Sequence, residues 1–318
     1  MGKGGFFTFK IIVCLMVYRF FLPLFCFLMV LLYGCAHNKK KNTEEGIYCD
    51  LKPIRVALLP TMDCLPYFVA DKCGIYSTLG IDVRLDVFEA AMDADTAFAN
   101  GHADILVTDI VKTIIMQSKG DSVGVLHNYD VPLFLLTSQT ARVYSLKNIN
   151  EKIVAITRNS WDDMSADCML ESVGLKSEEM NKPQINSLKL RTSMLVNNQY
   201  DGAILPEPYA TFAESCGAKR LCSTRNFRLK TGVALADDSI IDERKKEMKL
   251  FVKAYNLAVD TINNRIASSR NILGFLPVSI NLCDSLVRVD AYEHSTELSD
   301  TTYQLVYKWA KGRGLVGE

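Results

Sequence analysis

The sequence lacks a surplus of charge of either sign. Its 318 residues include 36 Lys and Arg against 36 Asp and Glu, and 49% of them are hydrophobic. This balance excludes a disordered chain and argues against a protein that holds nucleic acid through a basic surface. At about 150 residues per domain, the length predicts about two domains.

Familiar catalytic and metal-binding motifs are missing as well. The sequence contains no C-x-x-C, G-x-S-x-G, S-x-x-K or H-E-x-x-H pattern and no P-loop. Its four His residues are scattered, and none lies near a Cys at the spacing of metal ligands. We therefore expect no enzyme, no metal site and no cofactor.

The N-terminus has the pattern of an export signal. A basic start precedes an uncharged apolar run at residues 20–33, which is shorter than the roughly 20 residues of a membrane span but suits a signal peptide. The run ends in Leu-Tyr-Gly-Cys35, which resembles a bacterial lipobox and implies acylation of Cys35, for example with palmitate. We expect residues 1–34 to be the signal peptide and residues 35–52 to be the lipidated Cys and a tether. An uncleaved membrane anchor is the alternative. Because residues 16–19 would make an ordinary basic start of a signal peptide, the true start is expected at Met16.

An odd number of cysteines remains after Cys35. Cys216 and Cys222 could bridge a short loop, or they could be buried free thiols. The seven are Cys49, Cys64, Cys73, Cys168, Cys216, Cys222 and Cys283.

Apolar runs alternate with amphipathic segments along the rest of the chain. This alternation predicts an α/β fold with mixed, mostly parallel sheets flanked by helices. Asp93 and a Ser160-x-x-Asp163 capping box are expected to begin two of the helices. The expected strands are 54–59, 83–88, 105–107, 123–127, 133–137, 153–156 and 203–205, and the helices are 67–73, 94–100, 160–173, 209–216, 242–264 and 300–311.

Four stretches, in chain order over about residues 53–260, are similar to the NMT1/THI5-like and sulfonate-binding (SsuA-like) group of solute-binding proteins. Leu-Pro-Tyr-Phe-Val-Ala-Asp-Lys-Cys-Gly begins at residue 65, and Phe-Ala-Asn-Gly-His-Ala-Asp-Ile begins at residue 98. Ser-Leu-Lys-Asn-Ile at 145–149 precedes Lys-Ile-Val-Ala at 152–155, with Glu151 where the family has Gly. Ala-Ile-Leu-Pro-Glu-Pro-Tyr-Ala at 203–210 resembles a turn in the second lobe of the family.

The resemblance implies a two-lobed type II periplasmic-binding fold with the ligand held between the lobes. We place lobe one at residues 53–139 plus 231–318, with C-terminal helices packing on it, and lobe two at 140–230. The chain would cross between the lobes near 137–143 and 227–234.

The resemblance also implies a function. The chain would be an extracytoplasmic receptor of an ABC importer, lipid-anchored in the cell envelope, that passes a small solute to permease and ATPase subunits. We expect a monomer. A surface lipoprotein that binds a protein or a glycan is one alternative. An enzyme is another, because relatives of this fold synthesise pyrimidines, but they use a Cys-rich signature that is absent here.

Candidate ligand-binding residues follow from the rule that ligands lie beyond the carboxyl ends of strands. The rule selects the loops 60–67, 108–109, 158–163 and 206–209, which are rich in acids and contain a single base, Arg158. Acids would repel an anion and aromatic rings would stack on a flat ligand. We therefore expect a planar, amine-bearing ligand of the thiamine-precursor or aminopyrimidine type, with a sulfonate or nitrate as the alternative. The candidate residues are Thr61, Asp63, Tyr67, Asp109, Ser160, Trp161, Glu207 and Tyr209.

Each candidate also has a purely structural interpretation. The Asp residues could cap helices, Tyr67 and Trp161 could belong to the core, and the small hydroxyls of Thr61 and Ser160 could bond only to the backbone.

Overall fold

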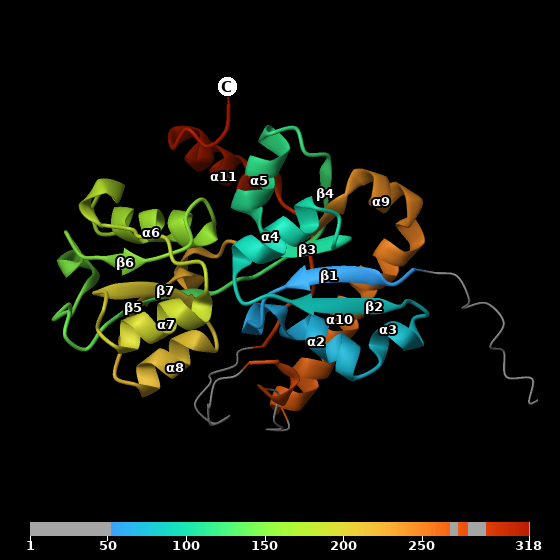
Figure 1. The fold of residues 1–318 in the computed structure, drawn as a ribbon, viewed down its shortest axis with the longest axis horizontal. Coiled ribbons are helices and arrows are strands. Elements are labelled where there is room, and N and C mark those ends of the chain that lie inside the picture. The colour runs from blue at the N-terminus through green and yellow to red at the C-terminus, as the bar shows by residue number, and fades with distance from the viewer. Residues whose placement is uncertain (1–51, 268–272, 279–290, 318) are drawn as a thin grey trace, which may run out of the picture. The chain divides into compact units, whose positions relative to one another are not determined.

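The computed structural model describes residues 52–267, 273–278 and 291–317 (Figure 1). The expected signal peptide at 1–34, the lipidated Cys35 and nearly all of the tether lie outside the described residues, as do Cys49 and Cys283. No helix in the described part of the chain is long and apolar enough to cross a membrane.

A five-stranded mixed sheet carries the first part of the fold, with the strand order β2-β1-β3-β9-β4. The central strand β1 runs parallel to both of its neighbours, whereas β9 runs antiparallel to β3 and β4. The strands are β1 (Ile54–Leu58), β2 (Val83–Val87), β3 (Ile105–Asp109), β4 (Val123–Tyr129) and β9 (Gly232–Asp237). They form where the expected apolar runs lie, except that β9 was expected only as part of a strand crossing between the lobes near 227–234.

A four-stranded sheet has the order β6-β7-β5-β8. Its strands are β5 (Leu133–Thr137), β6 (Val154–Ala155), β7 (Gly202–Pro206) and β8 (Lys219–Ser223), and only the β6–β7 pair is parallel. The α/β class with mixed sheets is confirmed. The expectation that parallel pairing would dominate is wrong for the described strands, because β5 and β9 each run antiparallel to both of their neighbours.

The chain passes between the two sheets twice. Residues 130–132 join β4 to β5, and residues 224–231 join β8 to β9. The first passage therefore lies before the expected 137–143, because β5 pairs with β7 and β8 and not with a strand of the first sheet. The division into two moving lobes stays a prediction.

Helices cover both sheets, as Figure 1 shows. The α-helices are α2 (Leu65–Lys72), α3 (Ile75–Thr78), α4 (Ala91–Ala99), α5 (Ile110–Ser118), α6 (Trp161–Glu171), α7 (Leu188–Val196), α8 (Tyr209–Ser215), α9 (Asp238–Glu243), α10 (Lys245–Ala267) and α11 (Asp300–Gly312). The 3-10 turns are η1 (Met62–Cys64), η2 (Leu146–Asn148), η3 (Ser177–Glu179), η4 (Thr224–Phe227) and η5 (Leu273–Phe275).

Two expected helices differ in the structure. Helix α4 begins after Ala90, so Asp93 lies inside its first turn and does not cap it. The single helix expected at 242–264 is two helices, α9 and α10, that meet at Arg244.

An aromatic cluster fixes α2 and α10 against the first sheet. Tyr67 is fully buried, stacks on Phe251 with 5.7 Å between ring centroids, and its hydroxyl lies 3.1 Å from Nε2 of His127. The ring of His127 lies 4.6 Å from that of Tyr255, and burial lowers the pKa of His127 to about 3, so this His is neutral. Tyr67 is therefore a core residue.

The C-terminal helix α11 packs against α5 on the side of the first sheet. It also bonds to α6, which follows a strand of the second sheet. Nε1 of Trp309 donates to Asp167 over 2.9 Å, and Arg313 donates to Ser177 over 2.7 Å. Helix α11 is thus tied to elements of both sheets.

The cysteines of the described residues are all unpaired. Cys216 is exposed and Cys222 is half-buried, so the bridge between them does not form in this structure.

Candidate functional site

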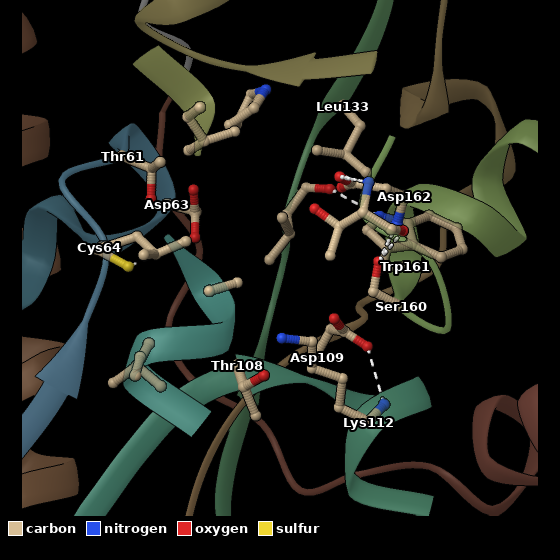
Figure 2. Close-up of a pocket in the computed structure, with 18 of the residues that line it drawn as sticks. Thr61, Asp63, Cys64, Thr108, Asp109, Lys112, Leu133, Ser160, Trp161 and Asp162 are labelled. Carbon is tan, nitrogen blue, oxygen red and sulfur yellow. Dashed lines mark hydrogen bonds between the residues drawn. The ribbon is translucent and has the colours of Figure 1, made fainter. Parts of the chain in front are cut away.

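A small cavity of about 90 Å³ lies where strand ends of the two sheets meet (Figure 2). All four loops that the strand-end rule selects contribute to its lining, together with the segment that joins the sheets. The lining side chains that carry polar groups are Thr61, Asp63, Cys64, Asp95, Thr108, Asp109, Lys112, Tyr129, Thr157, Ser160, Trp161, Asp162 and Asn186. The cavity is small beside the roughly 300–1,000 Å³ of common ligand pockets.

The N-terminus of α6 forms one wall of this cavity. Ser160 is its N-cap, as expected: the hydroxyl accepts from the backbone N–H of Asp162 over 3.2 Å and donates to the carbonyl of Thr157 over 2.7 Å. The indole N–H of Trp161 donates to the carbonyl of Val131 over 3.1 Å. That bond holds the ring at the cavity wall with only 2% of its surface exposed.

Asp109 lies between the first turns of two helices. Its carboxylate caps α5 by accepting from the backbone N–H of Lys112 over 3.1 Å. Burial raises its pKa to about 6, although Lys112 and the backbone N–H of Trp161 both favour the charged form. The ammonium of Lys112 is itself bonded to Asp95 over 2.5 Å. Asp109 therefore has backbone donors but no ion pair within residues 52–267, 273–278 and 291–317.

Asp63 faces the same cavity from the loop after β1, on the opposite side from α6 (Figure 2). Burial raises its pKa to about 6, against the effect of the Thr61 hydroxyl and the Cys64 thiol, which lies 3.5 Å from its carboxylate. No cation of the described chain forms an ion pair with Asp63. The cavity thus contains two carboxylates, Asp63 and Asp109, that form no ion pair with a described residue, although the ammonium of Lys112 also lines the cavity and lowers the pKa of Asp109.

Asp162 differs from these two because it is paired. Its Oδ2 accepts from the guanidinium of Arg191 over 2.6 Å and from the backbone N–H of Thr157 over 3.0 Å. Arg191 is fully buried behind the cavity wall. Sequence reasoning missed Arg191, and nothing in its local pattern on α7 signals that role. Lys112 was also missed, but its position one helical turn after Asp109 was a usable signal.

Contacts between the two sheets enclose the cavity. Ala90, before α4, forms a β-bridge with Ser187, before α7, and the amide of Asn186 lies 3.6 Å from the sulfur of Met92. On another side, the backbone N–H of Met62 donates to the carbonyl of Glu207 over 2.9 Å. These contacts join elements of the two sheets close to the cavity.

The structure brings five of the eight sequence-predicted residues together around this cavity: Thr61, Asp63, Asp109, Ser160 and Trp161. Tyr67 and Tyr209 are buried in hydrophobic clusters and line neither this cavity nor the one described next. Arg158, the single base of the four loops, is exposed and also lines neither cavity.

Glu207 lines a second, larger cavity of about 500 Å³, which the segment 224–231 borders. Its carboxylate accepts from Arg220 over 2.8 Å and from the backbone N–H of Thr211 over 3.0 Å. Two other charged groups of this cavity are also paired, since Lys230 bonds to Glu293 and His294 to Asp260. Asp63 lines both cavities, whereas Asp109 and the N-termini of α5 and α6 belong to the smaller one, and these favour the smaller cavity as the ligand site.

The profile of the NMT1/THI5-like family matches residues 61–265, which include every residue that lines the smaller cavity except Leu59. No curated protein matches the sequence.

Solved structures share the fold at low sequence identity. The alkanesulfonate-binding protein SsuA from Xanthomonas axonopodis pv. citri, bound to MOPS, is 13% identical with a TM-score of 0.73, over 85% of this chain and 96% of that one. The ligand-binding component of an ABC-type import system from Staphylococcus aureus, with zinc bound, is 16% identical with a TM-score of 0.70, over 83% and 93%. The nitrate-binding protein NrtA from Synechocystis PCC 6803 is 11% identical with a TM-score of 0.69, over 84% and 83%. At these identities the similarity establishes the type II periplasmic-binding fold.

Proposed function

Because the chain belongs to the NMT1/THI5-like family, we propose that it is the extracytoplasmic solute-binding receptor of an ABC importer and that its ligand is a small, planar, amine-bearing molecule. It would be a monomer, anchored in the cell envelope by lipid on Cys35. It would hold the ligand between its two lobes and deliver it to permease and ATPase subunits without chemical change. The family match and the shared fold of import-system proteins support the receptor role.

The observation that carries the ligand class is the pair of carboxylates that form no ion pair with a described residue, Asp63 and Asp109. A cationic solute would supply a positive charge and a neutral amine would donate hydrogen bonds to these carboxylates, whereas an anion would add to the repulsion. The ring of Trp161 offers a flat surface beside them.

The position of Asp109 at the N-termini of α5 and α6 also disfavours an anionic ligand. Anions commonly bind at helix N-termini, where backbone N–H groups are unpaired. Here the first turns of α5 and α6 both direct backbone donors, from Lys112 and Trp161, at the carboxylate of Asp109. The chain's own acid thus takes the place that a sulfonate or nitrate would need. This is why the anionic alternative is the weaker one, although solved neighbours are named for such anions.

Thermal-shift measurements on the full chain in detergent test the ligand class. The probes are thiamine, aminopyrimidines, polyamines, alkanesulfonates and nitrate. A ligand at 100 times its Kd adds about 2.7 kcal/mol of stability, which raises Tm by several degrees. We expect a shift with amine-bearing rings that is lost in Asp63→Asn and Asp109→Asn but kept in the control Asp121→Asn, which changes an exposed acid.

A shift with sulfonates or nitrate alone would keep the receptor role and overturn the amine-bearing ligand. If no small molecule stabilises the protein, the receptor proposal fails in favour of a lipoprotein that binds a protein or glycan.

A further inference from the structure

The C-terminal helix α11 joins the half of the fold built on the first sheet to the half built on the second. On one side it packs on α5, and its Val306 and Ala310 are fully buried in an apolar cluster that contains residues of α5 (Figure 1). On the other side the indole N–H of Trp309 donates to Asp167 of α6 over 2.9 Å. The first attachment is apolar and the second is polar.

The polar attachment contacts three side chains on the outer side of α6, which we call the outer cluster: Asp163, Asp167 and Lys182. Each of them is at most 6% exposed, and the ammonium of Lys182 donates to both carboxylates, over 3.0 and 2.5 Å. Asp167 accepts from Lys182 through Oδ1 and from the indole of Trp309 through Oδ2. The two acids thus share one cation, and α11 reaches them from outside.

Arg313, directly after α11, brings a second cation to the outer cluster. Its guanidinium lies 3.6 Å from the carboxylate of Asp163 and 3.5 Å from that of Asp167, and it donates to the hydroxyl of Ser177 over 2.7 Å. With Lys182 alone, the two acids would keep one net negative charge in a buried place, which is unfavourable. Arg313 balances that charge while its own side chain stays 32% exposed.

Helices α5 and α6 form two walls of the smaller cavity. Asp109 caps α5 and Ser160 caps α6, and both residues line that cavity, whereas no described residue of α11 does. Because a helix is a rigid element, a contact further along it fixes the direction of its first turn. By binding both helices, α11 therefore helps to set the spacing of the two walls from outside the ligand site.

The two attachments differ in what their loss would cost. Separation of Val306 and Ala310 from α5 would expose apolar surface to water, and no new interaction would replace it. Loss of the bonds of Trp309 and Arg313 would cost less, because water hydrates the polar groups that are set free. The polar attachment is therefore the one that gives way when the two halves separate.

We propose that α11 is a strap: it stays on α5, and its polar attachment to the outer cluster holds the two halves in the arrangement of this structure. When the chain opens about the connecting segments 130–132 and 224–231, Trp309 and Arg313 leave the outer cluster. The inference rests on the proposed function in one respect, that the two halves move, and it holds for any class of ligand.

Amide hydrogen exchange of the full chain in detergent at pH 7.5, read by mass spectrometry, measures the opening without a ligand. The reporter is the backbone N–H of Met62, after β1, which donates over 2.9 Å to the carbonyl of Glu207, after β7. This bond must break when the halves separate. The reference is β1, which lies inside the first sheet and exchanges on global unfolding. We expect Met62 to exchange faster than β1 in the wild type.

Two variants test the two attachments separately. Trp309→Phe combined with Arg313→Gln weakens the polar one and should speed exchange at Met62 about tenfold, through the loss of one hydrogen bond and one partly exposed ion pair. Val306→Ala weakens the apolar one, which stays formed on opening, so exchange at Met62 should change less than about twofold. Both variants lower the overall stability and should speed exchange in β1. The control Lys311→Gln removes an exposed charge from the same helix and should change neither rate.

The outcomes separate this inference from the function on which it rests. Exchange at Met62 that the double variant leaves unchanged, or that Val306→Ala speeds up equally, would overturn the strap while the receptor role stands. If Met62 responds as expected but no small molecule stabilises the protein in the thermal-shift screen, the strap stands and the receptor role fails.

Discussion

The acids Asp63 and Asp109 at the cavity are half-buried, and the acids Asp163 and Asp167 on the outer side of α6 are buried, but the two pairs differ most in their partners. Asp163 and Asp167 both bond to the buried ammonium of Lys182, over 3.0 and 2.5 Å. Burial alone would raise the pKa of Asp167, but hydrogen bonds, above all that of Lys182, outweigh it and lower this pKa. At the cavity, Asp63 and Asp109 have no such cation, and burial raises the pKa of each to about 6.

The difference shows two uses of the same residue type. The outer acids hold helices together, since they also bond to Trp309 of α11 and to Arg313 directly after it. The cavity acids contribute nothing comparable to packing and cost stability at neutral pH, because a buried carboxylate without a partner favours its neutral form. Folded proteins keep such costly groups mainly where a ligand needs them.

The largest effect is expected from breaking the outer cluster. Lys182→Met should lower the free energy of unfolding by about 3 to 5 kcal/mol, because two buried carboxylates lose their shared cation. Urea denaturation followed by circular dichroism measures this. The control is Lys152→Met, which removes a partly exposed pair with Asp201 at 3.5 Å and should cost less than about 1 kcal/mol. Equal losses in the two variants would show that the outer cluster is not a structural core.

At the cavity, replacing an acid is expected to raise the free energy of unfolding instead of lowering it. A folded-state pKa of about 6 against an ordinary value of 3.8 means that the folded protein holds the proton more tightly than the unfolded chain does. The stability from each acid is therefore complete below about pH 4 and is lost as the pH rises through 6. Asp63→Asn and Asp109→Asn should each raise the free energy of unfolding at pH 7 by about 1 to 2 kcal/mol.

Denaturation of these two variants at pH 4 and pH 7 checks the sign. The gain should vanish at pH 4, where the wild-type acids are protonated, and Asp121→Asn should change little at either pH. Destabilisation at pH 7 would mean that these acids have structural partners after all.

The affinity for a cationic ligand should depend on pH through the protonation of the same two acids, Asp63 and Asp109. We expect the affinity for 4-amino-1-methylpyridinium, which remains a cation throughout, to fall about tenfold, or about 1.4 kcal/mol, between pH 7.5 and pH 5. The physical reason is that Asp63 and Asp109 lose their negative charge on protonation. Calorimetric titration measures the change, and the double Asn variant should bind weakly with no pH dependence. A pH-independent wild type would remove these acids from the site.

The smallest effect is expected from the tie between α11 and α6. Trp309→Phe removes one hydrogen bond to Asp167 and should cost about 1 kcal/mol. Urea denaturation measures it against Tyr307→Phe, which loses only a long contact of 3.4 Å to a surface carbonyl. An unchanged free energy of unfolding in Trp309→Phe would show that the hydrogen bond from the indole to Asp167 does not stabilise the fold. Because the chain has two Trp residues, the variant also leaves Trp161 as the only indole that reports on the cavity.

Much of the fold followed from local pattern. The apolar runs at 54–59 and 133–137 became strands β1 and β5, and Ser160 caps α6 as its spacing indicated. The strand-end rule found a cavity-lining residue in each of its four loops. These inferences succeeded because strand formation, helix capping and the edge of a sheet depend on residues close together in sequence.

The errors concern pairing at long range. Tyr67 was expected at the ligand, but its ring packs on Phe251, which lies on α10, far along the chain. Arg158 was the only base visible in the loops, yet the cations of the site are Lys112 and Arg191, which reach it from α5 and α7. No spacing rule connects residue 191 with residue 162, since only the packing of α7 behind α6 brings them together.

The sequence by itself determined the family, the α/β class and the four acid-rich loops, because these depend on motif order and on the apolar periodicity of single elements. The tertiary structure alone decided which acids are paired. Asp162 and Asp163 are neighbours in sequence, yet one bonds to Arg191 behind the cavity and the other to Lys182 on the outer side of α6. A carboxylate's charge state follows from the cations and the water around it in space, and the chain order does not record these surroundings.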